Sequence, residues 1–273
     1  MIRRQVTLGD GSVDLIETGA GDDTIILVHG TASSPRAMGK LAALLAEAGW
    51  RVLAPAMIGY GASVMDGDDG VVARNARLLT GLRASLGAGR VVVIGHSMGG
   101  LVVLRALRGG MVADAAALYE PVAFAVLDRT DEAQRAAHAW DADVVARMAA
   151  QITAGDHEAG VRIFIEAWNG QAWTDLQANA RAGLVASAAV LLADVTAIGA
   201  DDAAADAYTT IAAPVLLISG TKSPVVAQMV CTVLAGAMPH ATIASIATAG
   251  HMAPVQQPDV VAGAVRHFLA GLM

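Results

Sequence analysis

Long apolar strands that alternate with helical segments are the feature of this sequence that most restricts its fold. Residues 24–29 read Thr-Ile-Ile-Leu-Val-His, and residues 90–94 and 214–219 are similar runs rich in Val, Leu and Ile. Strands that are apolar along their whole length are typical of parallel sheets covered by helices on both faces. Between these runs, apolar residues recur with helical spacing, as in Val71, Leu78, Leu79, Leu82 and Leu86. The alternation predicts an α/β fold built on a mostly parallel sheet.

Shorter segments complete the expected core. Residues 3–8 and 12–18 flank the turn Gly9-Asp10-Gly11, which predicts an antiparallel hairpin near the start of the chain. Further strands are expected at residues 51–54, 115–119 and 242–246, and further helices at residues 225–237 and 259–269.

The strand pattern is missing between residues 124 and 208. Apolar residues in this segment keep helical spacing instead, as in Val144, Val145, Met148 and Ile152. We interpret the segment as a helical cap inserted into one catalytic domain, because a single α/β domain commonly reaches the length of this chain. The predicted core comprises residues 1–121 and 209–273, and the predicted cap comprises residues 122–208.

A candidate nucleophile lies where one predicted strand turns into a helix. Gly95-His96-Ser97-Met98-Gly99 matches the pattern G-x-S-x-G between the run at 90–94 and the helix at 101–107. Such a turn is so tight that its flanking positions must lack bulky side chains, and it lifts the serine above the sheet edge. Ser97 is therefore the candidate nucleophile, and a purely structural turn is the alternative.

A serine nucleophile needs a base within hydrogen-bond reach and a third group that orients the base. His251 is the candidate base among the 7 histidines. It lies in the loop between the last predicted strand and the final helix, from which a side chain can reach back over the sheet edge. Other histidines are more simply explained by packing, by surface positions or by support of the turn: His96, His138, His157, His240 and His267.

With these motifs the chain resembles the α/β-hydrolase superfamily over nearly its full length. The resemblance rests on His29-Gly30-Thr31, Gly59-Tyr60-Gly61-Ala62-Ser63, the turn around Ser97, and Gly250-His251. It implies an eight-stranded sheet flanked by helices, a helical cap and a covalent acyl-enzyme mechanism. It also implies that the backbone N–H groups of Thr31 and Met98 form the oxyanion hole. A free N–H at a helix N-terminus is suited to that task.

One position departs from the family pattern. The acid usually follows the strand before the last, where this chain reads Gly220-Thr221-Lys222-Ser223-Pro224, so Ser223 stands where Asp is expected. A serine cannot stabilise an imidazolium as a carboxylate does. Glu120 is the candidate replacement, because it ends the strand after the turn helix and keeps the order nucleophile, acid, histidine. The alternatives are a capping or backbone-bonding role for Glu120, and three weaker carboxylates: Asp201, Asp202 and Asp206.

These residues predict a serine esterase that cleaves a carboxylic ester of a small to medium, mainly apolar substrate. A serine nucleophile argues against mechanisms with an aspartyl ester intermediate, as in haloalkane dehalogenases and epoxide hydrolases. Lactone opening and carbon–carbon bond hydrolysis use the same machinery and stay open, as does a weakly active ligand-binding protein. The walls of the substrate pocket are expected to come from aromatic residues of the cap: Phe124, Trp140, Phe164, Trp168 and Trp173.

Charge and motif content argue against other classes of protein. The formal net charge of -7 and the lack of a basic cluster disfavour nucleic acid as a partner. Cys231 is alone, and no spacing of metal ligands or phosphate-binding loop is found, so we expect no metal and no cofactor. No apolar run reaches the length of a membrane span. We expect a cytoplasmic enzyme that acts on a small-molecule ester, and we leave a homodimer open.

Overall fold

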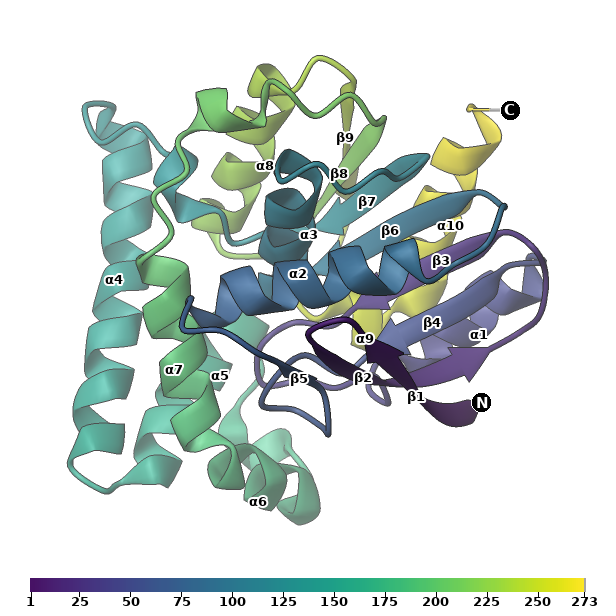
Figure 1. Cartoon of the computed structure of the whole chain (residues 1–273). Helices are drawn as coiled ribbons and strands as arrows, with labels where there is room; N and C mark the ends of the chain where they lie inside the picture. Colours follow the sequence, from purple (N-terminus) through teal and green to yellow (C-terminus); the bar gives the residue numbers. More distant parts are fainter. Residues whose placement is uncertain (273) are drawn as a thin grey trace.

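A twisted sheet with helices on both faces forms the body of the protein (Figure 1). The computed structural model describes residues 1–272. Its strands are β1 (Ile2–Leu8), β2 (Gly11–Thr18), β3 (Thr24–Val28), β4 (Arg51–Pro55), β5 (Val64–Met65), β6 (Val91–His96), β7 (Ala115–Tyr119), β8 (Val215–Gly220) and β9 (Ala241–Ile246). Its helices are α1 (Gly39–Glu47), α2 (Val71–Ala84), α3 (Met98–Arg108), α4 (Glu132–Thr153), α5 (His157–Asn169), α6 (Ala178–Ala186), α7 (Ala188–Gly199), α8 (Val225–Ala237), α9 (Ala253–Gln256) and α10 (Pro258–Ala270).

The sheet is mostly parallel, as predicted. Its order is β1-β2-β4-β3-β6-β7-β8-β9, and all neighbours from β4 to β9 run parallel. The expected hairpin is present, with β1 and β2 antiparallel and β2 antiparallel to β4. The eight strands on this path match the expected number. Within the described part of the chain, the short strand β5 pairs with β2 and brings the total to nine. Two residues are too few to form a recognisable strand pattern.

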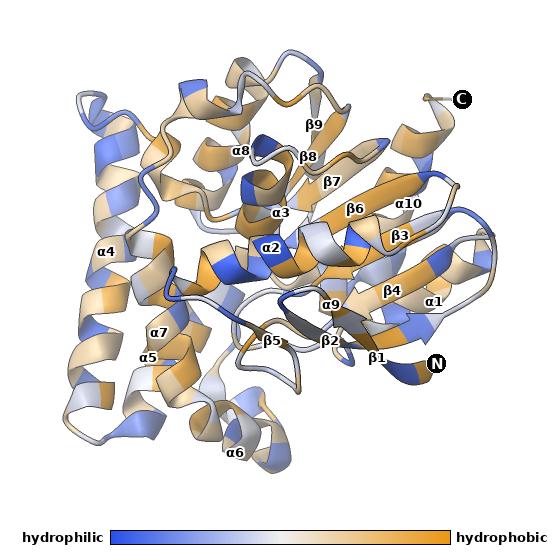
Figure 2. Cartoon of the chain, in the orientation of Figure 1, coloured by the Kyte–Doolittle hydropathy of each residue, from blue (hydrophilic) through white to orange (hydrophobic). Residues whose placement is uncertain are grey.

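Both faces of the sheet are apolar, which is why its central strands read as continuous hydrophobic runs. In β3, Ile25 and Leu27 pack on the face covered by α1, α9 and α10, whereas Ile26 and Val28 pack on the face covered by α2, α3 and α8. Figure 2 shows the central strands in the orange of hydrophobic residues, with blue hydrophilic positions scattered along the helices. This core holds the carboxyl ends of β3, β6, β7 and β8 together at one edge.

Helices α4 to α7 occupy the connection between β7 and β8, together with short 3-10 turns at Phe124–Val126, Trp173–Asp175 and Ala205–Tyr208. We call residues 124–208 the helical insertion. It has an apolar cluster of its own, in which residues of α4, α5 and α7 pack on one another, for example Met148, Ile165 and Leu191. In Figure 1 its long helix α4 stands beside the sheet body. The division of the chain into a core and a cap domain stays a prediction.

Helices α6 and α7 meet at Ser187 with a bend of 59°. Among residues 1–272 no single helix is long and apolar enough to cross a bilayer, although α6 and α7 together reach that length and hydropathy. Helix α7 buries Leu191, Asp194 and Val195, whereas α6 buries none of its residues. Helix α7 is therefore anchored in the insertion, and one acidic residue is buried with it.

Candidate active site

Ser97 lies in a strained turn between β6 and α3. Its backbone is in a left-handed conformation, with φ 54° and ψ −121°, which a non-glycine residue adopts at a cost. The glycines around it are required by close packing of the backbone. A Cβ at Gly95 would lie 2.7 Å from the Gly100 Cα, and one at Gly100 would lie 2.8 Å from the Pro121 Cβ. The turn around Ser97 therefore has no room for side chains at these two positions.

The loop after β3 runs directly beside this serine. A Cβ at Gly30 would lie 3.0 Å from the Ser97 Cβ. Thr31 follows Gly30, and its Oγ1 lies 3.3 Å from the sulfur of Met98, the first residue of α3. Within the described chain, neither the Thr31 N–H nor the Met98 N–H donates a hydrogen bond to another protein group. The structure thus places two free backbone donors next to Ser97, as the resemblance implies for an oxyanion hole.

His251 and Glu120 form a buried pair across the sheet edge. The Nδ1 of His251 lies 2.7 Å from Glu120 Oε2, and the Glu120 side chain is fully buried. The other carboxylate oxygen, Oε1, accepts a hydrogen bond from the Gly220 N–H at 2.7 Å. Glu120 has a left-handed backbone with φ 48°, which lets the chain leave β7 while the side chain reaches toward His251. The carboxylate therefore binds backbone and the histidine at once.

The position where the family pattern expects an acid is not joined to the histidine. Ser223 is buried, but its hydroxyl makes no hydrogen bond to His251. The three weaker carboxylate candidates also lie outside this pair, and one of them, Asp201, makes an ion pair with Arg105 at 3.3 Å. Of the carboxylates considered from the sequence, Glu120 is the one that the structure brings to His251.

Two neighbouring side chains hold the loop that carries His251. The Nε2 of His96 donates to the His251 carbonyl oxygen at 2.9 Å, and the Tyr119 hydroxyl donates to the Gly250 carbonyl oxygen at 2.8 Å. Burial, together with the nearby His251, lowers the pKa of His96 well below its usual value, so this imidazole is neutral at physiological pH. His96 therefore supports the site from behind.

His29 holds the loop after β3 from the opposite side. Its Nδ1 donates to the Gly30 carbonyl oxygen at 2.8 Å, and its Nε2 accepts from the Met57 N–H at 3.1 Å. Burial lowers the pKa of His29 to about 4. The neutral ring can donate through one nitrogen and accept through the other, which is the arrangement that these two hydrogen bonds require.

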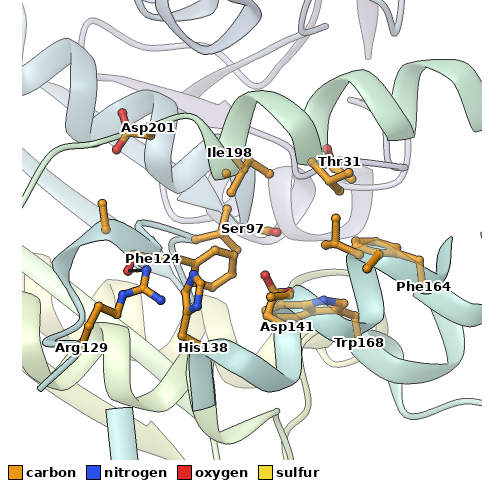
Figure 3. A pocket seen from close by; sticks show the side chains of 17 residues that line it. Thr31, Ser97, Phe124, Arg129, His138, Asp141, Phe164, Trp168, Ile198 and Asp201 are labelled. Atoms are coloured by element: carbon orange, nitrogen blue, oxygen red, sulfur yellow. Dashed lines mark hydrogen bonds between the residues drawn. The ribbon is translucent and has the colours of Figure 1, made fainter. Parts of the chain in front are cut away.

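Ser97 opens into a cavity of about 310 Å³ between the sheet edge and the helical insertion (Figure 3). Most of its lining is apolar and comes from α4, α5, α7 and the segment after β7: Val122, Phe124, Val145, Phe164, Trp168, Val195 and Ile198. Three of the five aromatic residues expected to form the walls are among these. Trp140 lines a neighbouring cavity on the other side of Trp168, and Trp173 packs inside the insertion.

Trp168 connects this cavity to the histidine. Its ring centroid lies 4.7 Å from that of His251, and its side chain is buried. Within residues 1–272, the Ser97 hydroxyl makes no hydrogen bond to His251, whose ring is bonded to Glu120. Catalytic hydrogen bonds often form or tighten only when a substrate is bound. Trp168 and the pair with Glu120 restrict the imidazole to the neighbourhood of the cavity.

Two buried carboxylates near the cavity were missed by sequence reasoning. Asp141 of α4 lines the cavity, and Asp194 of α7 lies behind Thr31; burial raises the pKa of each to about 6. A signal for one of them exists in the sequence, because Asp194 interrupts the otherwise apolar run Val-Leu-Leu-Ala-Asp-Val. Among the described residues, no group of three His, Cys, Asp or Glu side chains could hold a metal ion.

Comparison with known proteins agrees with this architecture. The model of a family described as the alpha/beta hydrolase family matches residues 25–264. No curated protein sequence gave a match.

Solved structures of similar fold include three bacterial hydrolases. A hydrolase from Pseudomonas aeruginosa PA01 has a TM-score of 0.77 and 22% identity, with 98% of each chain covered. A thermophilic esterase from Thermogutta terrifontis has a TM-score of 0.75 and 22% identity, covering 100% of this chain and 99% of that one. An esterase from Rhodococcus sp. ECU1013 has a TM-score of 0.74 and 21% identity, with 100% of both chains covered. At these identities the likeness concerns the fold, and the family model covers most of the chain. The protein therefore belongs to the alpha/beta hydrolase family.

Proposed function

We propose that this protein is a serine esterase that cleaves a carboxylic ester through an acyl-enzyme intermediate. The observation that carries the proposal is the buried His251–Glu120 pair, 2.7 Å apart, at the same sheet edge as the strained turn of Ser97. A nucleophile, a base and a group that orients the base are the parts that acyl transfer to water needs.

Each residue has a defined role in the proposed reaction. Glu120 accepts a hydrogen bond from the Nδ1–H of His251, which keeps the proton on Nδ1 and leaves Nε2 free to take the proton of Ser97. The Ser97 oxygen then attacks the ester carbonyl, and the N–H groups of Thr31 and Met98 stabilise the negative charge that forms on the carbonyl oxygen. His251 returns the proton to the leaving alcohol. Water, activated by the same histidine, hydrolyses the acyl-enzyme in the second half of the cycle.

The cavity supports a substrate of small to medium size with an apolar part. Its volume of about 310 Å³ is at the lower end of the range for small-molecule sites, and its walls are largely aliphatic and aromatic. Four ionisable side chains interrupt this lining: Arg129, His138, Asp141 and Asp201. Asp201 is paired with Arg105, and Arg129 and Asp141 carry opposite charges, so the lining offers little net charge to an ionic substrate. We therefore propose an uncharged ester as the substrate.

The test is hydrolysis of a series of p-nitrophenyl esters, from acetate to octanoate, combined with fluorophosphonate labelling of the active serine. The wild type should hydrolyse at least one ester and take up the label, and Ser97→Ala should lose both properties. Ser85→Ala is the matched control, because Ser85 is exposed at the end of α2.

Three outcomes lead to different conclusions. Labelling of Ser97 without hydrolysis of any ester would contradict ester specificity and favour the lactone or carbon–carbon bond reactions. Hydrolysis that survives Ser97→Ala would contradict the assigned nucleophile. Absence of both hydrolysis and labelling would favour a ligand-binding role.

A further inference from the structure

Asp194 is a buried carboxylate in the helical insertion whose hydrogen-bond partners are neutral hydroxyl groups. It lies on α7 and is 1% exposed. Its Oδ2 accepts a hydrogen bond from the Tyr60 hydroxyl at 2.6 Å and a second one from the Thr31 hydroxyl. No Lys, Arg or His of residues 1–272 forms an ion pair with it. Burying a carboxylate without a cation is unfavourable. The position of Asp194 therefore needs an explanation, and its two hydroxyl partners indicate one.

Both partners of Asp194 connect to the loop that borders Ser97. Thr31 is itself part of this loop, and Tyr60 reaches it because the Tyr60 hydroxyl accepts a hydrogen bond from the Ala32 N–H at 2.8 Å. A tyrosine hydroxyl has a single proton. Since Tyr60 donates this proton in its hydrogen bond to Asp194, the Tyr60 oxygen faces the Ala32 N–H as an acceptor. Asp194 thus holds two consecutive residues of the loop, one directly and one through Tyr60.

The loop adopts a conformation that needs such support. Ala32 has a left-handed backbone with φ 51°, which is uncommon for a residue with a side chain and persists where surrounding contacts impose it. His29 holds the preceding residue, Gly30, through its carbonyl oxygen. The N–H of Thr31 lies between these two anchors and makes no hydrogen bond within the described chain. The anchors therefore fix the backbone on both sides of the free donor.

We propose that Asp194 is a positioning residue for the oxyanion hole, which it maintains by holding Thr31 and Tyr60 so that the Thr31 N–H is directed at the reacting carbonyl oxygen. The inference rests on the proposed function of Ser97. Donors of this kind are effective because they are fixed before the reaction begins. Without the carboxylate, the Thr31 hydroxyl would lose its charged acceptor, and its hydrogen bond to the weak acceptor Met98 sulfur, 3.3 Å away, would remain.

The same contact joins the oxyanion hole to the substrate cavity. Helix α7 contributes Val195 and Ile198 to the cavity wall, one and four residues after Asp194. It also packs on the loop of Tyr60, where a Cβ at Gly59 would lie 2.9 Å from a Val190 methyl group. A displacement of α7 would therefore move the cavity wall and loosen the loop together. The helical insertion completes the site as well as enclosing it.

The test compares Asp194→Ala with Asp194→Asn on the ester that the wild type hydrolyses best. Loss of the carboxylate should lower kcat about 10- to 100-fold, as expected for a displaced oxyanion donor, and should change KM by less than about threefold. The Asn variant keeps an oxygen acceptor for both hydroxyls and should recover most of kcat. Asp143→Ala is the matched control, because Asp143 is an exposed aspartate of the insertion paired with Arg147.

Two further variants make the test independent of the folding of Asp194→Ala. Tyr60→Phe and Thr31→Val each remove one of the two hydroxyls, and each should lower kcat with little change in KM. Combined with Asp194→Ala, each should add less than its separate effect, because the groups act as one unit. Circular dichroism and thermal unfolding show whether each variant is folded at the assay temperature.

A readout without turnover separates this inference from the proposed function. Amide hydrogen exchange of Ala32 should become faster in Asp194→Ala and in Tyr60→Phe, and should stay unchanged in Asp143→Ala. An active wild type whose kcat is retained in Asp194→Ala would overturn the inference alone. An inactive wild type would contradict the proposed function, and unchanged exchange of Ala32 would then overturn the inference as well.

Discussion

Glu120→Gln is the substitution that most directly tests how the site works. In the wild type one carboxylate oxygen accepts from the Gly220 N–H and the other from His251 Nδ1, each at 2.7 Å. Glutamine has the same shape, so its oxygen can keep the hydrogen bond to Gly220. Its amide nitrogen then faces His251. The substitution therefore changes one acceptor into a donor and leaves the packing of a fully buried side chain almost unchanged.

The expected consequence is a wrong tautomer of His251. An amide NH₂ group cannot accept a hydrogen bond from Nδ1–H but can donate one to Nδ1, so the imidazole carries its proton on Nε2 and loses the lone pair that would take the proton of Ser97. The analogous change in a serine protease triad lowers kcat about 10⁴-fold. Four factors of ten correspond to between about 5 and 6 kcal/mol of transition-state stabilisation. We expect a loss of this size, with KM affected much less.

The assay is the steady-state rate on the best p-nitrophenyl ester, with circular dichroism as the check on folding. Nitrogen NMR of the histidine side chains reports the tautomer of His251 directly. Ser223→Ala is the control, since Ser223 stands where the family pattern places the acid, and we expect it to retain activity within about twofold. A folded Glu120→Gln variant with more than about a tenth of the wild-type kcat would refute the assigned role of Glu120.

Two further predictions concern stability. Burial raises the pKa of Asp141 from 3.8 to about 6, so the folded state binds more protons than the unfolded state between these values, and wild-type stability falls as the pH rises through this window. Asp141→Asn should therefore raise the free energy of unfolding by up to about 3 kcal/mol at neutral pH and by almost nothing below about pH 4; urea unfolding that gives the same difference at both pH values would contradict this. Gly99→Ala should destabilise the protein by about 1 to 3 kcal/mol, because the new methyl group would meet the carbonyl oxygens of His29 and Val28, which are backbone atoms. Thermal unfolding measures this loss, with Gly183→Ala as the control: Gly183 lies in α6 with open space around it, so this variant should be neutral or stabilising, and equal stability of the two variants would contradict the prediction.

The fold and the turn around Ser97 were predictable because both depend on local patterns. Apolar runs such as residues 24–29 and 90–94 must be buried on both faces, which predicts a helix-covered parallel sheet. The turn around Ser97 depends on glycines within five residues, so a short motif contains most of its geometry. The two-residue strand β5 escaped prediction, because its pairing depends on β2 and not on a pattern of its own.

Helical periodicity alone did not show which aromatic residues of the insertion line the cavity. Helical spacing indicated that the insertion has a buried face, and Phe124, Phe164 and Trp168 do line the cavity. The same spacing could not separate them from Trp173, which packs among the helices, or from Trp140, which lies beside a second cavity. A period of 3.6 residues identifies one side of a helix, but not what that side contacts.

The sequence by itself determined the α/β architecture, the turn of Ser97 and membership of the alpha/beta hydrolase family. Only the tertiary structure decided which buried polar groups meet. Glu120 is 131 residues from His251, and Asp194 is 163 residues from Thr31, yet each pair is joined by a hydrogen bond. Propensity and hydrophobic pattern act over a few residues and predict which side chains are buried. The partner of a buried carboxylate depends instead on how distant segments pack, because a buried polar group must find its hydrogen bonds wherever the fold brings a donor.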